Sequence, residues 1–202
     1  MIKAITFDLD GVYFTQDSFK KFKSIFPTNN ADPDFVEHVL KKSDEMMNFK
    51  KGIMTETEYW EYVNKSFGQN LSIDEITNLL MEAYSTNQNV VDYVKKVRSE
   101  GIKTCICTNN FPTRINALNK KFNFLTDFDV QVFSYEVGIN KPDPKIFQEL
   151  INNSGVLPSE LFYADDNQSC VDSAKSLGIN AIFYTNFDDF KVRCLTKVRQ
   201  MI

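Results

Sequence analysis

The feature that most constrains the fold is an apolar run near the N-terminus that ends abruptly on two carboxylates. Residues 4–7 are apolar or β-forming, and Asp8, Leu9, Asp10 and Gly11 follow them directly. Such a run is typical of a buried strand in a parallel sheet, whose carboxyl end would carry both acids. Because strand side chains alternate, Asp8 and Asp10 should leave the strand in similar directions unless the backbone turns between them. The structural alternative is an ordinary strand followed by an acidic Asp-Gly turn, so the rest of the chain has to decide.

Strand-like and helical segments alternate from residue 87 onward. Helices are expected at 90–100, 112–122, 144–153 and 169–177, with a last amphipathic helix at the end, and strands at 103–107, 128–133, 161–164 and 181–184. This alternation predicts βαβ units, and therefore an α/β fold in which helices cover both faces of a parallel sheet.

The segment between the first strand and this alternating region shows helical patterns only. We expect four helices there: one over 17–26, one over 33–49, one opened by the capping-box pattern of residues 55–58 and ended by Gly68, and one opened by the same pattern at residues 72–75. The sequence therefore predicts a helical cap, residues 15–85, inserted into an α/β core made of residues 1–14 and 86–202.

Composition limits the class of protein. The 202 residues are 43% hydrophobic and 25% charged, with a net charge of −4, which fits a globular protein without a nucleic-acid or anionic-membrane surface. The sequence has no apolar run of membrane-spanning length and no secretory leader, so we expect a cytoplasmic protein. Four scattered cysteines predict core thiols. The aromatic residues Tyr59, Trp60 and Tyr62 are candidates for an interface, which leaves a monomer or a homodimer open.

Polar residues recur where the predicted strands end, and ligands of open α/β sheets bind at this edge. Thr108 and Asn109 follow the second strand, Asp165 and Asp166 follow the fourth, and Lys141 opens the helix between the third and fourth. Carboxylates gathered at one edge raise each other's pKa, and Mg²⁺ relieves this because it prefers carboxylate oxygens. A magnesium ion with a lysine and a hydroxyl suits a phosphate, and a carboxylate beside the metal can act as nucleophile.

Four short motifs, taken in order, resemble those of the haloacid dehalogenase (HAD) superfamily. Residues 8–12 resemble its first motif (Asp-x-Asp-Gly-Thr/Val), Thr108 its second, residues 141–142 its third and residues 164–167 its acidic fourth. The helical insert after the first motif, with residues 51–55 and 58–60, is similar to the C1 cap of the subgroup that includes the phosphatase domain of soluble epoxide hydrolase. The resemblance implies a Rossmann-like core with an inserted helical C1 cap.

The resemblance also implies roles for the four acids. Asp8 would attack phosphorus and bind Mg²⁺, while Asp10 would protonate the leaving alkoxide, activate the hydrolytic water and bind the metal through its backbone carbonyl. Asp166 would bind the metal directly and Asp165 through water, although the sequence leaves open which of these two is the direct ligand.

A second group of residues would hold the phosphate. By the same resemblance Leu9, Thr108, the amide of Asn109 and Lys141 contact the phosphoryl group. Lys141 would also steady the nucleophile, so that it and Thr108 belong to the catalytic set.

These roles predict a Mg²⁺-dependent phosphomonoester hydrolase that acts on a small phosphorylated metabolite through an aspartyl-phosphate. The acid at Asp10 separates this activity from dehalogenation, because the dehalogenases of the superfamily lack it. A sugar phosphomutase and a catalytically silent binding or regulatory module stay open as alternatives. Tyr13, Phe14 and Phe111 are candidates either for an apolar wall of the substrate site or for packing between cap and core.

Overall fold

A five-stranded sheet forms the centre of the computed structural model, which describes residues 1–199. The strands are β1 (Ala4–Phe7), β2 (Lys103–Thr108), β3 (Val130–Phe133), β4 (Leu161–Asp165) and β5 (Asn180–Phe183). Their order is β3-β2-β1-β4-β5, and every neighbouring pair is parallel. Strand β1 lies in the middle and all four of its residues are buried, which explains its uninterrupted apolar sequence.

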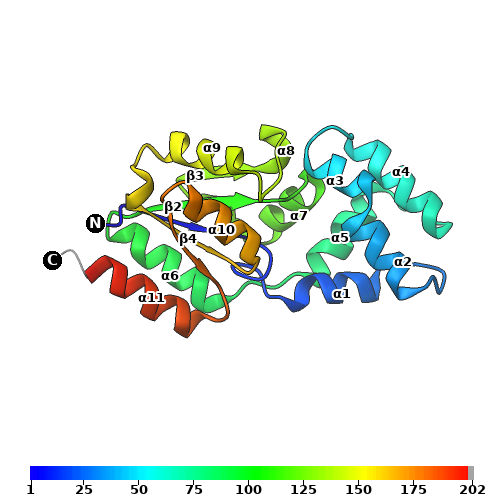
Figure 1. Cartoon of the computed structure of the whole chain (residues 1–202). Helices are drawn as coiled ribbons and strands as arrows, with labels where there is room; N and C mark the ends of the chain where they lie inside the picture. The colour runs from blue at the N-terminus through cyan, green and yellow to red at the C-terminus, as the bar shows by residue number, and fades with distance from the viewer. Residues whose placement is uncertain (200–202) are drawn as a thin grey trace.

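Helices cover both faces of this sheet (Figure 1). They are α6 (Gln88–Ser99), α7 (Pro112–Phe122), α9 (Pro144–Ser154), α10 (Gln168–Ser176) and α11 (Phe187–Arg199), with short turns η2 (Phe124–Asp127), α8 (Ser134–Val137) and η3 (Pro158–Glu160). One core cluster joins Phe7 to α6, α7 and α11, and a second joins Cys105 and Cys107 to α9 and α10. The predicted Rossmann-like α/β fold is confirmed, and so are buried cysteines.

The segment between β1 and α6 is helical, as expected. It contains α1 (Asp17–Ile25), α2 (Pro33–Glu37), the π-helix η1 (His38–Lys42), α3 (Asp44–Lys50), α4 (Glu56–Phe67) and α5 (Ile73–Ala83). These helices lie together beyond one end of the sheet, at the opposite end from the N-terminus (Figure 1). The chain leaves and rejoins the sheet at adjacent points, because the amide of Thr15 donates to the carbonyl of Ser85 at 2.9 Å. The division into cap and core at residues 15 and 85 stays a prediction.

The single helix predicted over residues 33–49 was wrong. Ser43 interrupts it with an extended backbone (φ −62°, ψ 156°) that separates η1 from α3. The Ser43 hydroxyl donates to the carbonyl of Val39 at 3.2 Å and accepts from the amide of Met46 at 3.1 Å. Serine is a favoured N-cap because its hydroxyl satisfies an otherwise free amide of the first turn, so the segment restarts as a new helix. The segment therefore has five α-helices and a π-helix among its described residues, where we expected four helices.

Both predicted capping boxes are present. In the first, the Thr55 hydroxyl accepts from the amide of Glu58 at 3.3 Å, and the Glu58 carboxylate accepts from the amide of Thr55 at 2.8 Å. Ser72 and Glu75 make the same pair of bonds at the start of α5. Gly68 ends α4 with φ +62°, a left-handed conformation that glycine adopts without strain.

Side-chain hydrogen bonds tie the helical segment to the α/β part. The Trp60 indole donates to the Thr113 hydroxyl at 2.8 Å, and that hydroxyl donates to Glu56. Ser134 donates to the carbonyl of Lys50 at 2.6 Å. Tyr59 and Trp60 are buried and so do not offer an oligomer interface, whereas Tyr62 is half-buried, and the choice between monomer and homodimer stays a prediction. Among the described residues, no helix has the length and apolarity needed to cross a membrane.

Candidate active site

The loop after β1 brings its two acids to the carboxyl end of the sheet in different surroundings. The amide of Asp8 donates to the carbonyl of Ala164 in β4 at 3.1 Å, and its side chain is buried. Asp10 is 37% exposed at its side chain and lies at the edge of a cavity. Gly11 follows with φ +79°, and a Cβ there would lie 2.1 Å from Oδ2 of Asp166. Glycine is therefore required both for the turn and for the close approach of the loops after β1 and β4.

A buried lysine joins two of the predicted acids. Nζ of Lys141 lies 2.9 Å from Oδ1 of Asp8 and 2.6 Å from Oδ2 of Asp165. Burial acts to lower the pKa of Lys141, but the charges of Asp165 and Asp8 outweigh it and hold the pKa well above its usual range. The ammonium group is therefore a fixed positive charge beside Asp8.

Asn109 positions this lysine from the end of β2. Its side-chain amide donates to the carbonyl of Lys141 at 2.9 Å, and its side-chain oxygen accepts from the amide of Lys141 at 2.7 Å. This reciprocal pair fixes the loop that carries Lys141, a role of the Asn109 side chain that the sequence analysis did not foresee. Thr108 ends β2 as a buried residue, and Leu9 is buried beside Asp8.

Asp165 and Asp166 differ in the partners that they have. Oδ2 of Asp165 accepts from Lys141 at 2.6 Å and from the Tyr163 hydroxyl, and Oδ1 accepts from the amide of Asn167 at 2.7 Å. For Asp166, the described side chains provide neither a hydrogen bond nor an ion pair. One oxygen each of Asp8, Asp165 and Asp166 lies within 4.8 Å of the others, so these three acids form a cluster that could hold a metal ion.

Burial and mutual repulsion perturb the acids of this cluster. Burial raises the pKa of Asp8 to about 7, against the opposing charge of Lys141 and with further increases from Asp165 and Asp10. The pKa of Asp166 rises to about 6 through burial and then through the charges of Asp165 and Asp10. Unrelieved carboxylate charge is costly in a buried site, and all the donor atoms are oxygens, so the cluster suits a hard divalent cation.

Arg114 is a site residue that the sequence analysis missed. Its Nη2 lies 2.7 Å from Oδ2 of Asp10, its Nε donates to the side-chain oxygen of Asn110 at 2.8 Å, and its Nη1 donates to the Tyr84 hydroxyl at 2.9 Å. The guanidinium lies over the ring of Phe111, 4.7 Å from its centroid. In the sequence Arg114 is one more charge on an amphipathic helix. The available signal was its place in the first turn of a helix that Pro112 opens directly after the end of β2.

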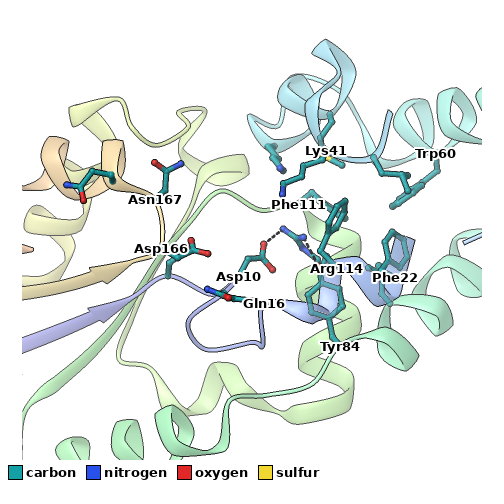
Figure 2. A pocket seen from close by; sticks show the side chains of 18 residues that line it. Asp10, Gln16, Phe22, Lys41, Trp60, Tyr84, Phe111, Arg114, Asp166 and Asn167 are labelled. Atoms are coloured by element: carbon teal, nitrogen blue, oxygen red, sulfur yellow. Dashed lines mark hydrogen bonds and ion pairs between the residues drawn. The ribbon is translucent and has the colours of Figure 1, made fainter. Parts of the chain in front are cut away.

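A cavity of about 560 Å³ lies between these residues and the helical segment. In Figure 2, Asp166 and Asp10 lie on one side, and Phe22, Trp60 and Lys41 of the helical segment lie on the other. The lining residues are Asp8, Asp10, Gly11, Gln16, Phe19, Phe22, Leu40, Lys41, Met46, Lys50, Trp60, Leu80, Tyr84, Phe111, Arg114, Asp166, Asn167 and Gln168.

Of the three aromatic residues that were candidates for an apolar wall of the substrate site, one lines the cavity and two do not. Phe111 lines it, whereas Tyr13 and Phe14 do not line it and are buried against Phe124. Of the residues assigned to phosphate binding, Lys141 lies behind Asp8, in contact with its carboxylate, and does not itself line the cavity.

Comparison with known proteins agrees with this geometry. The chain is 25% identical over 198 residues to the D-ribitol-5-phosphate phosphatase of Bacteroides thetaiotaomicron, covering 95% of this chain and 96% of that one. It is also 25% identical over 203 residues to mouse bifunctional epoxide hydrolase 2, and this match covers 92% of the chain but only 37% of the longer mouse enzyme.

A solved structure and a family profile extend the comparison. A HAD family enzyme from Bacteroides thetaiotaomicron, crystallised with magnesium and inorganic phosphate, has the same fold, with a TM-score of 0.75 and 22% identity over 92% of this chain and 95% of that one. The profile of the haloacid dehalogenase-like hydrolases matches residues 2–178. With the parallel sheet and the acidic cluster at its carboxyl end, this match shows that the chain belongs to the haloacid dehalogenase-like hydrolase family.

Proposed function

We propose that the protein is a Mg²⁺-dependent phosphomonoester hydrolase that acts through an aspartyl-phosphate on Asp8. The observation that carries this proposal is the buried contact of Lys141 with both Asp8 and Asp165, with Asp166 alongside. A structural salt bridge needs one acid for one lysine, whereas this lysine has two and a third acid lies beside them. Such an excess of buried negative charge is the arrangement expected where a cation and a phosphoryl group bind.

The donor set supports Mg²⁺, which binds through one or two carboxylates, water and substrate phosphate. Asp8 and Asp166 are the acids proposed to hold it directly. Both oxygens of Asp165 are already engaged by Lys141, Tyr163 and the backbone, so Asp165 is proposed to act through water. When bound, the ion supplies positive charge that screens the phosphoryl oxygens and lowers the pKa of Asp8.

The chain's own residues carry the proposed steps. A carboxylate oxygen of Asp8 attacks phosphorus, and the bond from phosphorus to the ester oxygen breaks. Asp10 gives its proton to the departing alkoxide and is left as a carboxylate, which Arg114 stabilises at 2.7 Å. Asp10 then takes a proton from water, the resulting hydroxide attacks the phosphorus of the aspartyl-phosphate, and Asp8 is released with inorganic phosphate.

The cavity supports a small substrate. Its volume of about 560 Å³ is typical of sites for small molecules, and the helical segment forms one of its walls. The Bacteroides relative is a D-ribitol-5-phosphate phosphatase, so a substrate search should include phosphorylated polyols and sugars, both with and without a second anionic group.

Hydrolysis of 4-nitrophenyl phosphate tests the proposal. We expect turnover with Mg²⁺, loss of turnover in excess chelator, and no turnover by Asp8→Asn although its circular dichroism is unchanged. Asp74→Asn is the matched control, because Asp74 is an exposed acid in the helical segment. Near wild-type turnover by Asp8→Asn would refute the assignment of the nucleophile.

A further inference from the structure

The wall of the cavity that the helical segment forms carries an amine without a partner. Lys50 is the last residue of α3, and its carbonyl is held by the Ser134 hydroxyl at 2.6 Å. Its side chain is half-buried and lines the cavity with Asp10 and Arg114. Within the described part of the chain, no side chain or backbone oxygen is hydrogen-bonded or ion-paired to Nζ of Lys50. Burial, followed by the charge of Arg114, lowers its pKa to about 8.

A second amine, Lys41, lines the same cavity from the π-helix. Its Nζ lies 5.1 Å from the centroid of the Phe19 ring and 3.7 Å from Oε1 of Glu37. That carboxylate is already bound by Lys23 at 2.7 Å, so it neutralises Lys41 only in part. In Figure 2 Lys41 lies across the cavity from Asp166.

In the part of the chain that the structure describes, neither Asp8 nor Asp10 forms an ion pair with Lys41 or Lys50. Asp10 already has Arg114 at 2.7 Å, and Asp8 already has Lys141 at 2.9 Å. Arg114 already uses three of its five N–H donors within the protein, on Asp10, Asn110 and Tyr84, whereas Nζ of Lys50 uses none on any described residue. A poorly hydrated ammonium group held at a cavity wall costs free energy unless a bound anion completes its hydrogen bonds.

We propose that Lys50, with Lys41, binds a second anionic group on the part of the substrate that leaves as the alcohol. This inference rests on the proposed function, because it takes the phosphoryl group to lie at Asp8, against the opposite wall. The preferred substrates are then phosphomonoesters that also carry a carboxylate or a second phosphate, rather than neutral sugar or polyol phosphates. Phe111 and Trp60 also line the cavity, and they offer apolar surface to the carbon chain that joins the two anions.

Matched substrate pairs test this subsite. 3-Phosphoglycerate and glycerol 3-phosphate differ by a carboxylate, and fructose 1,6-bisphosphate and fructose 6-phosphate differ by a phosphate. For the wild type, we expect kcat/KM for the anionic member to exceed that for its partner at least tenfold in one pair. The pair that shows this preference identifies the second anion.

Substitutions of the two lysines then test whether they cause this preference for the anionic substrate. Lys50→Met should reduce the ratio of the two kcat/KM values about tenfold, Lys41→Met should reduce it less, and Lys50→Arg should keep it. Lys42→Met is the matched control, because Lys42 also lies near Glu37 but does not line the cavity. Equal ratios for wild type and Lys50→Met, or an equal loss for both members of a pair, would overturn the subsite.

Calorimetry separates failure of the subsite from failure of the proposed function. Asp8→Asn, with Mg²⁺, should bind 3-phosphoglycerate or fructose 1,6-bisphosphate more tightly than the neutral partner, and Asp8→Asn/Lys50→Met should lose this preference. Absence of all turnover by the wild type would refute the proposed function. Equal affinity within both pairs would refute the second-anion subsite whether or not turnover is seen.

Discussion

Replacing Arg114 by methionine should slow the proposed reaction only where the leaving group needs a proton. Among the described side chains, Asp10 is the one acid within ion-pair distance of Arg114. Any effect of Arg114 on the chemistry should therefore depend on the carboxyl group of Asp10. An alkoxide leaves poorly without protonation, whereas 4-nitrophenolate leaves readily without it. Arg114→Met should therefore impair the first step on glycerol 3-phosphate far more than on 4-nitrophenyl phosphate.

The size of the effect follows from the contact that is lost. The Arg114–Asp10 pair is one charge-assisted hydrogen bond of 2.7 Å, partly open to solvent on the side of Asp10. Such a bond is worth about 1.5–3 kcal/mol, which corresponds to a rate loss of about 10- to 100-fold if it holds the acid in place during proton transfer. This is less than the roughly 10²–10⁴-fold that a positioned general acid supplies, as expected when Asp10 itself is retained. The loss on the aryl ester should stay below about threefold, because no such transfer limits its first step.

Single-turnover kinetics provides the assay, because it isolates phosphoryl transfer from hydrolysis of the intermediate. Asp10→Asn should show the same selectivity for the alkyl ester, with a larger effect. Arg98→Met is the matched control, since Arg98 is paired with Asp129 on an exposed surface. Arg114→Lys guards against misfolding, because it keeps the charge beside the buried Tyr84 hydroxyl. An equal loss on both esters would show that Arg114 supports the fold and does not position the acid.

Three further predictions follow from local geometry. Gly11→Ala should weaken Mg²⁺ binding, measured by calorimetry, at least tenfold, because the added Cβ would lie 2.1 Å from Oδ2 of Asp166. Gly101→Ala is the control, since Gly101 also has a positive φ (+84°) but no atom within 4 Å of the added Cβ. Equal effects of the two substitutions would mean that backbone strain alone is responsible. Ser43→Ala should lower the free energy of unfolding in urea by about 1 kcal/mol through loss of an N-cap, and an unchanged midpoint would contradict that role. In chelator, the wild-type melting temperature should fall between about pH 4 and 7, because a pKa raised from 3.8 to about 7 means that folded Asp8 holds its proton more tightly than the unfolded chain. Asp8→Asn should reduce this slope, of which the raised pKa of Asp166 keeps a part, and parallel curves would refute the reasoning.

Much of the fold could be predicted because its signals are local. The helix expected at 112–122 matches α7, and the capping boxes at residues 55–58 and 72–75 open α4 and α5. Each depends on a proline or a capping pair whose effect is settled within one turn. The break at Ser43 was missed because apolar residues continue on both sides of it, and their spacing alone resembles one helix.

The candidate site was predictable only in part, for a physical reason. Asp8 and Asp166 could be placed because strand ends converge at one edge of a parallel sheet. Arg114 and Lys50 could not, because the contact of Arg114 with Asp10 and the cavity that Lys50 lines form only when helices dock against the sheet. A charged residue on an amphipathic helix is usually solvated, so its burial against an acid is a property of tertiary structure alone.

The charges at the carboxyl end of the sheet explain why substrate, metal and helical segment belong together. In the described structure, four carboxylates face two engaged cations there: Asp8, Asp10, Asp165 and Asp166 against Lys141 and Arg114. One divalent cation balances that excess, and a phosphate dianion then adds two further negative charges. Metal and phosphate therefore reinforce each other's binding, as linkage requires of ligands of opposite charge at one site. Lys141 contacts the proposed nucleophile from the α/β part, whereas Lys41 and Lys50, the lysines proposed to bind substrate, come from the helical segment. We therefore expect substitutions in the helical segment to change which phosphate ester is accepted while the chemistry proposed at Asp8 stays the same.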